Sequence, residues 1–311
     1  MAMGPDAQAE RLSAGSIGLW GRLDHLDLAE AMSVVRWCET MGLAAFWTPE
    51  VLGREPFVLQ AILSGATRSI LLGTAIASVY ARDAATARAA AATISELSGG
   101  RFVLGLGVSH AEFVAGQRRR EFGAPIPTMR AYLEAYRAAP YEGSVPFDDP
   151  LILLAALRER MLGLAATVGG AFGYYAPVSW VPRARATLDS GWPSGARRPI
   201  LAVTMPFVAT DDPSAARAAG RAYVGRGLAL AIYREVLAAQ EFGPADLADG
   251  GSDRLIDELV AWGSLDQIRQ RLDALRAGGA DHVALVPLAP SGRILDAHGL
   301  EGVASLVDSL R

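Results

Sequence analysis

The chain has 311 residues, of which 51% are hydrophobic and 20% charged, and its formal net charge at pH 7 is −4. This balance supplies no broad basic face, so we expect no nucleic-acid partner. The single cysteine, Cys38, excludes an intrachain disulfide and a cysteine-cluster metal site. No apolar run approaches the roughly 18–20 residues of a membrane helix and the first residues lack a signal-peptide pattern, so we expect a cytoplasmic protein with no membrane partner.

Short apolar runs alternate with longer helical patterns almost throughout the chain. Several runs are apolar at successive positions, as in a parallel sheet that is buried on both faces. The candidate strands are 16–20, 44–48, 70–76, 101–106, 151–156, 170–175, 200–205 and 282–287. Their number and order predict an α/β fold, a (β/α)8 TIM barrel forming one domain over residues 1–311, rather than an open doubly wound sheet.

Two connections are longer than usual, 107–149 after the fourth strand and 206–281 after the seventh. Long excursions from a compact barrel usually carry lids, substrate walls or subunit contacts. Among the helices, the Ala-rich segment after Asp83 begins with a suitable N-cap, and Cys38 continues an apolar helical stripe that predicts a buried position.

Reactive groups of such a barrel lie at the carboxyl ends of its strands. The residues there are mostly aromatic and apolar, which predicts a flat conjugated ligand rather than a sugar or a nucleoside triphosphate. The four histidines lack close ligand spacing, so we expect no metal site. The sequence contains no lysine, which excludes a Schiff-base mechanism and argues against a barrel hydrolase or aldolase.

The stretch "SGGRFVLGLGVSH", residues 98–110, places Gly-Leu-Gly at the end of a strand. A dinucleotide-binding turn needs a third glycine at the position that His110 occupies, so this is not a Rossmann fingerprint. The strand instead places the hydroxyl of Ser109 and the imidazole of His110 at the open end of the barrel.

The block "LLGTAIASVYARDAATARAAAATISELSGGRFVLGLGVSH", residues 71–110, resembles the luciferase-like family of flavin- and deazaflavin-dependent enzymes, closest to its coenzyme F420-dependent branch. Further stretches at 42–50, 153–165, 250–272 and 277–288 extend the resemblance over nearly the whole chain. It implies a barrel that holds a tricyclic ring over the strand ends and there exchanges a hydride or activates oxygen, in a homodimer or larger assembly.

The resemblance also implies roles for individual residues. Ala75 and Ile76 match a bulge with a non-proline cis peptide that backs the ring, the alternative being an ordinary trans strand. Gly107, Val108 and Ser109 match the backbone that approaches the cofactor. His110 matches a catalytic acid or base beside the ring, for which an imidazole is suited, or it serves only as a hydrogen-bonding residue.

Glu50 matches a catalytic position that faces substrate, or it is an exposed carboxylate that caps the next helix. The resemblance places the cofactor phosphate at the start of the helix after the fifth strand, near Ala156, Leu157, Arg158 and Arg160. Many relatives have Gly-Pro in place of Arg158 and Glu159. An arginine there could grip the phosphate, Arg158 could exclude it, or both arginines could be solvated charges.

The predicted substrate-binding residues are Trp20, Trp47, Tyr80 and Tyr174. Of Tyr174 and its neighbour Tyr175, one is expected to stack on substrate and the other to pack in the core, because alternation sends them to opposite faces. After the third strand Arg82 stands where relatives place a basic or imidazole group, and its role is left open.

Two functions are compatible with these residues. The first is an oxidoreductase or monooxygenase that uses coenzyme F420, or FMN, to transfer a hydride to or from a small organic substrate. The alternative is a cofactor-free relative that catalyses a non-redox rearrangement or cyclisation, or only binds a small molecule, as the changes at the phosphate site suggest.

Overall fold

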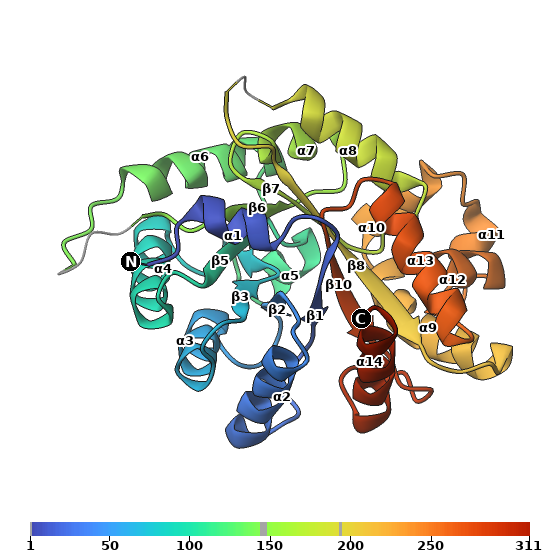
Figure 1. The fold of residues 1–311 in the computed structure, drawn as a ribbon. Helices are drawn as coiled ribbons and strands as arrows, with labels where there is room; N and C mark the ends of the chain where they lie inside the picture. The colour runs from blue at the N-terminus through green and yellow to red at the C-terminus, as the bar shows by residue number, and fades with distance from the viewer. Residues whose placement is uncertain (1, 144–147, 193–194) are drawn as a thin grey trace.

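The computed structural model describes residues 2–143, 148–192 and 195–311. Within these ranges eight parallel strands form a closed ring, in which β10 pairs with both β8 and β1. The ring strands are β1 (Ser16–Trp20), β2 (Ala45–Thr48), β3 (Leu71–Thr74), β5 (Phe102–Gly107), β6 (Ile152–Ala155), β7 (Gly170–Gly173), β8 (Ile200–Val208) and β10 (His282–Pro287). Figure 1 shows them at the centre of the molecule with the helices around them. The predicted (β/α)8 barrel and its eight strands are confirmed.

The outer helices follow the strands and begin with the local signals that the sequence contains. They are α2 (Leu28–Thr40), α3 (Pro56–Ala66), α4 (Ala84–Ser98), α7 (Glu159–Ala165), α8 (Trp180–Ser190), α13 (Leu265–Ala277) and α14 (Ala297–Ser309). Asp83 caps α4 by accepting from the Thr86 backbone N–H, as predicted. Asp27 and Ser264 form capping boxes at α2 and α13. Cys38 on α2 is fully buried, which is also confirmed.

A further short helix, α1 (Pro5–Arg11), lies at the amino ends of the strands. Its buried Gln8 donates to the carbonyls of Gly100 and Phe102 at 2.7 and 2.8 Å and accepts from the Leu151 N–H at 2.6 Å. One side chain thus satisfies backbone groups at the starts of two strands. This end of the barrel is closed by protein, so the opposite end carries the candidate site.

The two long connections form extra helices and short strands. After β5 come α5 (Ala111–Gly116) and α6 (Pro125–Ala138), and residues 144–147 of this predicted excursion lie outside the described ranges. After β8 come α9 (Pro213–Leu228), α10 (Ala231–Ala238), α11 (Pro244–Leu247) and α12 (Asp253–Leu259). The short strands β4 (Ala77–Ser78) and β9 (Ala261–Trp262) extend the sheet beside β5 and β8.

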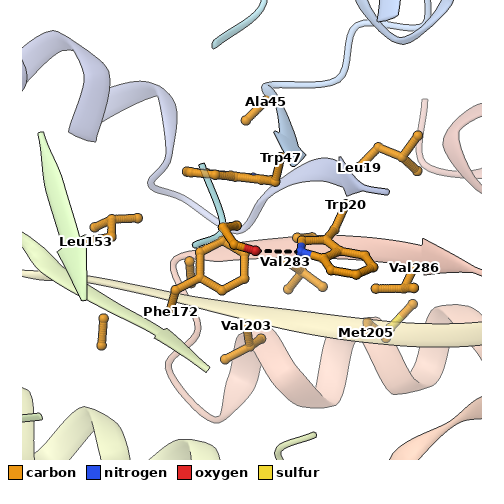
Figure 2. Packing of buried hydrophobic residues seen from close by; sticks show 14 of the residues in the cluster. Leu19, Trp20, Ala45, Trp47, Leu153, Phe172, Val203, Met205, Val283 and Val286 are labelled. Atoms are coloured by element: carbon orange, nitrogen blue, oxygen red, sulfur yellow. Dashed lines mark hydrogen bonds between the residues drawn. The ribbon is translucent and has the colours of Figure 1, made fainter. Parts of the chain in front are cut away.

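Large side chains fill the barrel interior (Figure 2). Trp47 lies edge-on to Phe172, with ring centroids 5.0 Å apart, and its indole N–H donates to Nε2 of His282 at 2.9 Å. Gly73 makes room for it, because a Cβ there would lie 2.3 Å from the indole ring. Trp47 has no exposed surface. Its complete burial leaves no area for a substrate, which argues against the predicted role.

No helix within the described ranges is both long and apolar enough to cross a bilayer.

Candidate active site at the carboxyl ends of the strands

A bulge separates β3 from β4, and the Ala75–Ile76 peptide bond within it is cis, as the resemblance implied. The Trp20 indole N–H donates to the Ala75 carbonyl oxygen at 2.9 Å, the bond drawn as a dashed line in Figure 2. The Glu50 backbone N–H donates to the Ile76 carbonyl oxygen at 3.1 Å. The ends of β1 and β2 therefore hold the bulge between them. Its contact with a cofactor stays a prediction.

The Gly-Leu-Gly sequence at the end of β5 packs against this bulge. A Cβ at Gly105 would lie 1.9 Å from the Thr74 carbonyl oxygen, and one at Gly107 would lie 2.5 Å from Cδ1 of Ile76. Gly105 is thus needed for the close approach of two backbone segments, whereas a Cβ at Gly107 would displace the end of the Ile76 side chain. That Gly107, Val108 and Ser109 also approach a cofactor stays a prediction.

His110 lies between the carboxyl end of β5 and the start of α5. Ser109 before it has a left-handed φ of 59°. The half-buried imidazole lies 5.7 Å from the Phe113 ring and 5.5 Å from the Tyr233 ring, between centroids. Burial lowers the pKa of His110, opposed in part by the charge of Glu112. The ring is therefore neutral at pH 7 and able to accept a proton.

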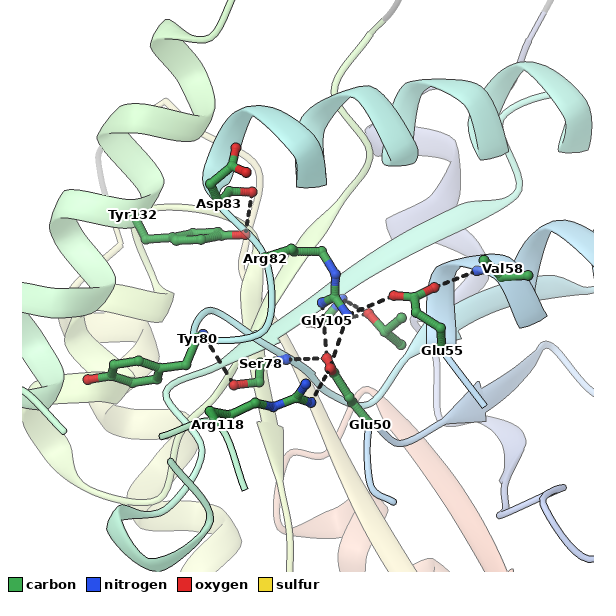
Figure 3. Close-up of polar contacts among 11 residues, drawn as sticks. Glu50, Glu55, Val58, Ser78, Tyr80, Arg82, Asp83, Gly105, Arg118 and Tyr132 are labelled. Atoms are coloured by element: carbon green, nitrogen blue, oxygen red, sulfur yellow. Dashed lines mark hydrogen bonds and ion pairs between the residues drawn. The ribbon is translucent and has the colours of Figure 1, made fainter. Parts of the chain in front are cut away.

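Glu50 lies at the centre of an ion-pair network (Figure 3). Oε2 accepts from the Ser78 N–H at 2.8 Å and from Arg82 at 3.0 Å, while Oε1 accepts from Arg82 at 3.0 Å and from Arg118 at 2.6 Å. The side chain is only 5% exposed. The prediction of an exposed helix-capping carboxylate is wrong, because Glu55 caps α3.

These bonds occupy both carboxylate oxygens of Glu50, which argues against the catalytic role implied by the resemblance. The residue instead joins the bulge to the connection after β5, from which Arg118 comes. Arg82 lies over the Phe57 ring at 4.6 Å and pairs with two carboxylates, Glu50 and Glu55. Its charge is thus compensated within the protein.

Tyr80 also contacts the connection after β5. Its hydroxyl accepts from the Gly123 N–H at 2.8 Å, and its ring stacks on Phe122 with centroids 5.8 Å apart. Both contacts serve the protein, so a substrate contact by Tyr80 stays a prediction.

Tyr174 and Tyr175 follow β7 and diverge. Tyr174 stacks on Phe172 of the barrel interior at 5.0 Å and contacts the edge of Trp20 at 6.4 Å. Tyr175 packs instead against α9 and α10, 5.1 Å from Tyr223 and 4.8 Å from Tyr233 between ring centroids. Burial raises the pKa of Tyr174 well above its ordinary value and that of Tyr175 to about 12, so both phenols are neutral. The opposite faces predicted for the pair are thus observed.

The start of α7 is the predicted phosphate position. The Ala156 N–H donates to the Phe172 carbonyl and the Leu157 carbonyl accepts from the Trp180 indole, so both residues are held by β7 and α8. Arg158 and Arg160 are exposed. The Arg158 side chain does not cap the helix but forms an ion pair with Glu235 of α10. This exposed pair is compatible with the solvated-charge alternative, and whether Arg158 grips or excludes a phosphate stays a prediction.

Sequence reasoning missed four residues that meet the site from the long connections. They are Arg118, Tyr223, Tyr233 and Glu235. Their segments were predicted to form walls or lids, but no local pattern marks which side chain reaches the strand ends. Only the placement of α9 and α10 brings these tyrosines to Tyr175 and His110.

Comparisons with known proteins agree with this architecture. The family model of luciferase-like monooxygenases matches residues 5–282. A putative coenzyme F420-dependent oxidoreductase of Mycobacterium tuberculosis is 26% identical over 328 residues, covering 85% of this chain and 91% of that protein.

Two solved structures share the fold. The coenzyme F420-dependent tetrahydromethanopterin reductase of Methanopyrus kandleri superposes with a TM-score of 0.71 at 17% identity, covering 95% of this chain and 99% of the other. The oxygenating constituent of 3,6-diketocamphane monooxygenase from Pseudomonas putida, in complex with FMN, gives 0.67 at 14% identity and 94% coverage of both chains. With its family match over most of its length, this chain belongs to the luciferase-like monooxygenase family.

Proposed function

We propose that this protein uses coenzyme F420, with FMN as the alternative cofactor, to oxidise, reduce or oxygenate a small organic substrate at the carboxyl ends of the strands. The observation that carries the proposal is the position of His110, a neutral imidazole among aromatic rings at the open end of the barrel. A group that gains or loses a proton while a hydride moves needs this combination of place and charge state. The relative from M. tuberculosis, named as F420-dependent, supports the first cofactor.

The residues present fit a phosphate-bearing ring cofactor. The first turn of α7 has no side-chain cap, and its exposed Arg158 and Arg160 add positive charge beside the backbone N–H groups. The ring would lie against the bulge at Ala75 and Ile76. When bound, the cofactor would supply hydride exchange or oxygen activation. This chain would position the cofactor and the substrate and exclude water from them.

In this arrangement His110 would hold or release a proton at a nitrogen of its own imidazole ring. Phe113 and Tyr233 flank the imidazole and limit the access of water to it. Trp20 orients the bulge by its bond to the Ala75 carbonyl. Substrate selection then falls to the aromatic side chains above the barrel interior.

One observation favours the cofactor-free alternative. Glu235 places a carboxylate on Arg158 at the start of α7, where a cofactor phosphate would need the same positive charge. A protein that closes this position permanently would perform acid–base chemistry or bind a small molecule without a redox group. The ion pair is exposed, with side chains 53% and 62% accessible, so it is weak enough to exchange for a phosphate.

Titration of the wild-type protein with F420 and, separately, with FMN tests the proposal. We expect micromolar binding of F420, several-fold tighter binding by Glu235→Gln, and about tenfold weaker binding by Arg158→Gly. Glu241→Gln, which changes an exposed carboxylate just after α10, is the matched control and should leave affinity unchanged. If neither cofactor binds any of these proteins, the redox proposal is wrong and the cofactor-free function stands.

A further inference from the structure

Tyr174 occupies a particular layer of the barrel. Along β7 the side chain of Phe172 points into the interior, Gly173 faces Trp180 on the outside, and Tyr174 points inward again. Its ring lies one layer above Phe172, beside Trp20. Tyr174 is therefore part of the floor of the open end, where the candidate site lies.

The hydroxyl of Tyr174 is buried, and its oxygen lies within reach of the Trp20 indole N–H, but its proton has no acceptor among the described residues. Its nearest ring neighbours offer no acceptor, because Phe172 is apolar and an indole N–H only donates. The Trp20 N–H is itself used by the Ala75 carbonyl. The phenolic proton of Tyr174 thus has nothing in the protein to bind.

Neighbouring tyrosines do not share this property. The hydroxyls of Tyr175 and Tyr223 are hydrogen-bonded to each other. A buried donor without an acceptor costs stability, and in a native protein it calls for an explanation such as a ligand. The place of Tyr174 at the strand ends supplies that explanation.

The surroundings define what kind of acceptor would fit. The rings that meet Tyr174 belong to Trp20 and Phe172, and neither carries charge. A site with one neutral donor and aromatic walls suits an uncharged, flat molecule with an oxygen acceptor.

We propose that Tyr174 donates a hydrogen bond to the carbonyl oxygen of an uncharged, flat organic substrate and so positions that substrate in the site. The inference deepens the proposed function and rests on it for the reaction that follows binding. The binding experiment below separates substrate from cofactor as the acceptor. Stacking of Tyr174 on substrate, the role first expected, is disfavoured because Phe172 covers one face of its ring.

Binding of coumarin and of 2H-chromene to the full-length protein tests the inference. The two probes share shape and ring oxygen, and only coumarin has a carbonyl. We expect wild type to prefer coumarin and Tyr174→Phe to bind coumarin about tenfold more weakly, with 2H-chromene unaffected. In infrared spectra the C=O stretch of bound coumarin should shift to lower frequency in wild type, and this shift should vanish in Tyr174→Phe.

Two further variants act as controls. Tyr136→Phe removes the hydroxyl of another buried, unpartnered tyrosine, on α6 outside the site, and should change neither binding nor the carbonyl frequency. Tyr223→Phe breaks a satisfied hydroxyl pair and should lower the melting temperature, whereas Tyr174→Phe should melt at or above the wild-type temperature. The melting temperatures thus show whether a variant loses coumarin binding because it unfolds or because it lacks the hydroxyl.

The inference is overturned if wild type does not bind coumarin at millimolar concentration, or if Tyr174→Phe keeps both its affinity and the frequency shift. It is also overturned if Tyr174→Phe loses affinity for F420 and not for coumarin, because the acceptor would then lie on the cofactor. Failure of the proposed function looks different, since neither F420 nor FMN would bind any variant while the coumarin result in the cofactor-free protein would be unaffected.

Discussion

At the scale of single residues, His282 shows how burial sets a charge state. Its ring has no exposed surface and lies between two partners, with Nε2 accepting from Trp47 and Nδ1 2.8 Å from the Ser16 hydroxyl. Because Nε2 accepts, the ring proton resides on Nδ1 and is donated to Ser16. Burial lowers the pKa of His282 to about 3, so the folded protein keeps it neutral across the physiological range.

This burial predicts a pH dependence of stability. Between pH 6.5 and 3 the unfolded chain binds a proton at His282 that the folded chain does not, so the free energy of unfolding falls as the pH falls. The slope from this group is about 1.4 kcal/mol per pH unit, and the contribution is fully present above pH 6.5. Urea unfolding between pH 5 and 8 measures it.

His282→Gln keeps an acceptor for Trp47 and a donor for Ser16 but does not titrate, so it should unfold with a shallower pH slope than wild type. His25→Gln, at an exposed position, should retain the wild-type slope. Equal slopes in wild type and His282→Gln would contradict the argument.

At the scale of elements, the connection after β5 is held by side chains rather than by the sheet. Arg118 binds Glu50, and the Tyr80 hydroxyl accepts from Gly123. Its helix α5 carries only one fully buried side chain, that of Val114. An element with so few core contacts opens more readily than the barrel around it.

Tyr80→Phe should therefore loosen this connection without unfolding the barrel. Loss of one hydrogen bond, worth about 1 kcal/mol net, raises the open population roughly fivefold. Trypsin should cut after the exposed Arg119 and Arg120 about fivefold faster, while the urea midpoint stays near that of wild type. Tyr132→Phe, whose hydroxyl makes only a 3.5 Å contact with Asp83, is the control and should be cut at the wild-type rate. An unchanged rate in Tyr80→Phe would show that other contacts hold the segment.

At the scale of the whole molecule, the two ends of the barrel differ. Gln8 and His282 satisfy polar groups at and near the amino ends, while the carboxyl ends carry the Tyr174 hydroxyl, whose proton lacks an acceptor, and the half-buried His110. The contacts that satisfy buried polar groups and the candidate site thus lie at opposite ends of the barrel, an arrangement typical of barrels of this type. A ligand at the open end would stabilise the entire domain by mass action.

Cofactor at 100 times its dissociation constant should raise the free energy of unfolding by about 2.7 kcal/mol. For a chain of this size the melting temperature should rise by about 4 °C. Differential scanning calorimetry with F420 and with FMN measures the effect, and riboflavin, which lacks the phosphate, is the control for the α7 position. A melting temperature that neither cofactor moves would contradict the redox proposal. The homodimer expected from the resemblance stays a prediction.

Much of the fold could be predicted because its signals are local. Apolar runs mark the strands, and Asp83 or Ser264 mark helix starts, since a cap acts within three residues of the chain. Strand boundaries shifted where tertiary contacts intervened. The predicted strand 70–76 ends at Thr74 in the bulge, and 200–205 continues to Val208 because β10 pairs with it as far as Phe207 and β9 pairs with its last two residues.

The candidate site was less predictable from the sequence. Glu50 stands at the end of a strand, as expected, but Arg118 comes from 68 residues further along the chain and occupies its carboxylate. Trp47 ends inside the barrel because Gly73 and His282 make a place for it. Neither outcome has a local signal, since each depends on which side chain arrives from another element.

The sequence by itself determined the barrel class, the order of its strands, the helix caps and the family resemblance, because periodicity, capping and motif spacing act over short stretches of chain. The tertiary structure alone decided that Glu235 meets Arg158, that Tyr233 meets His110, and that the Tyr174 hydroxyl is left without an acceptor. Each of these outcomes depends on segments that lie tens of residues apart in the sequence, and on how the long connections pack over the strand ends.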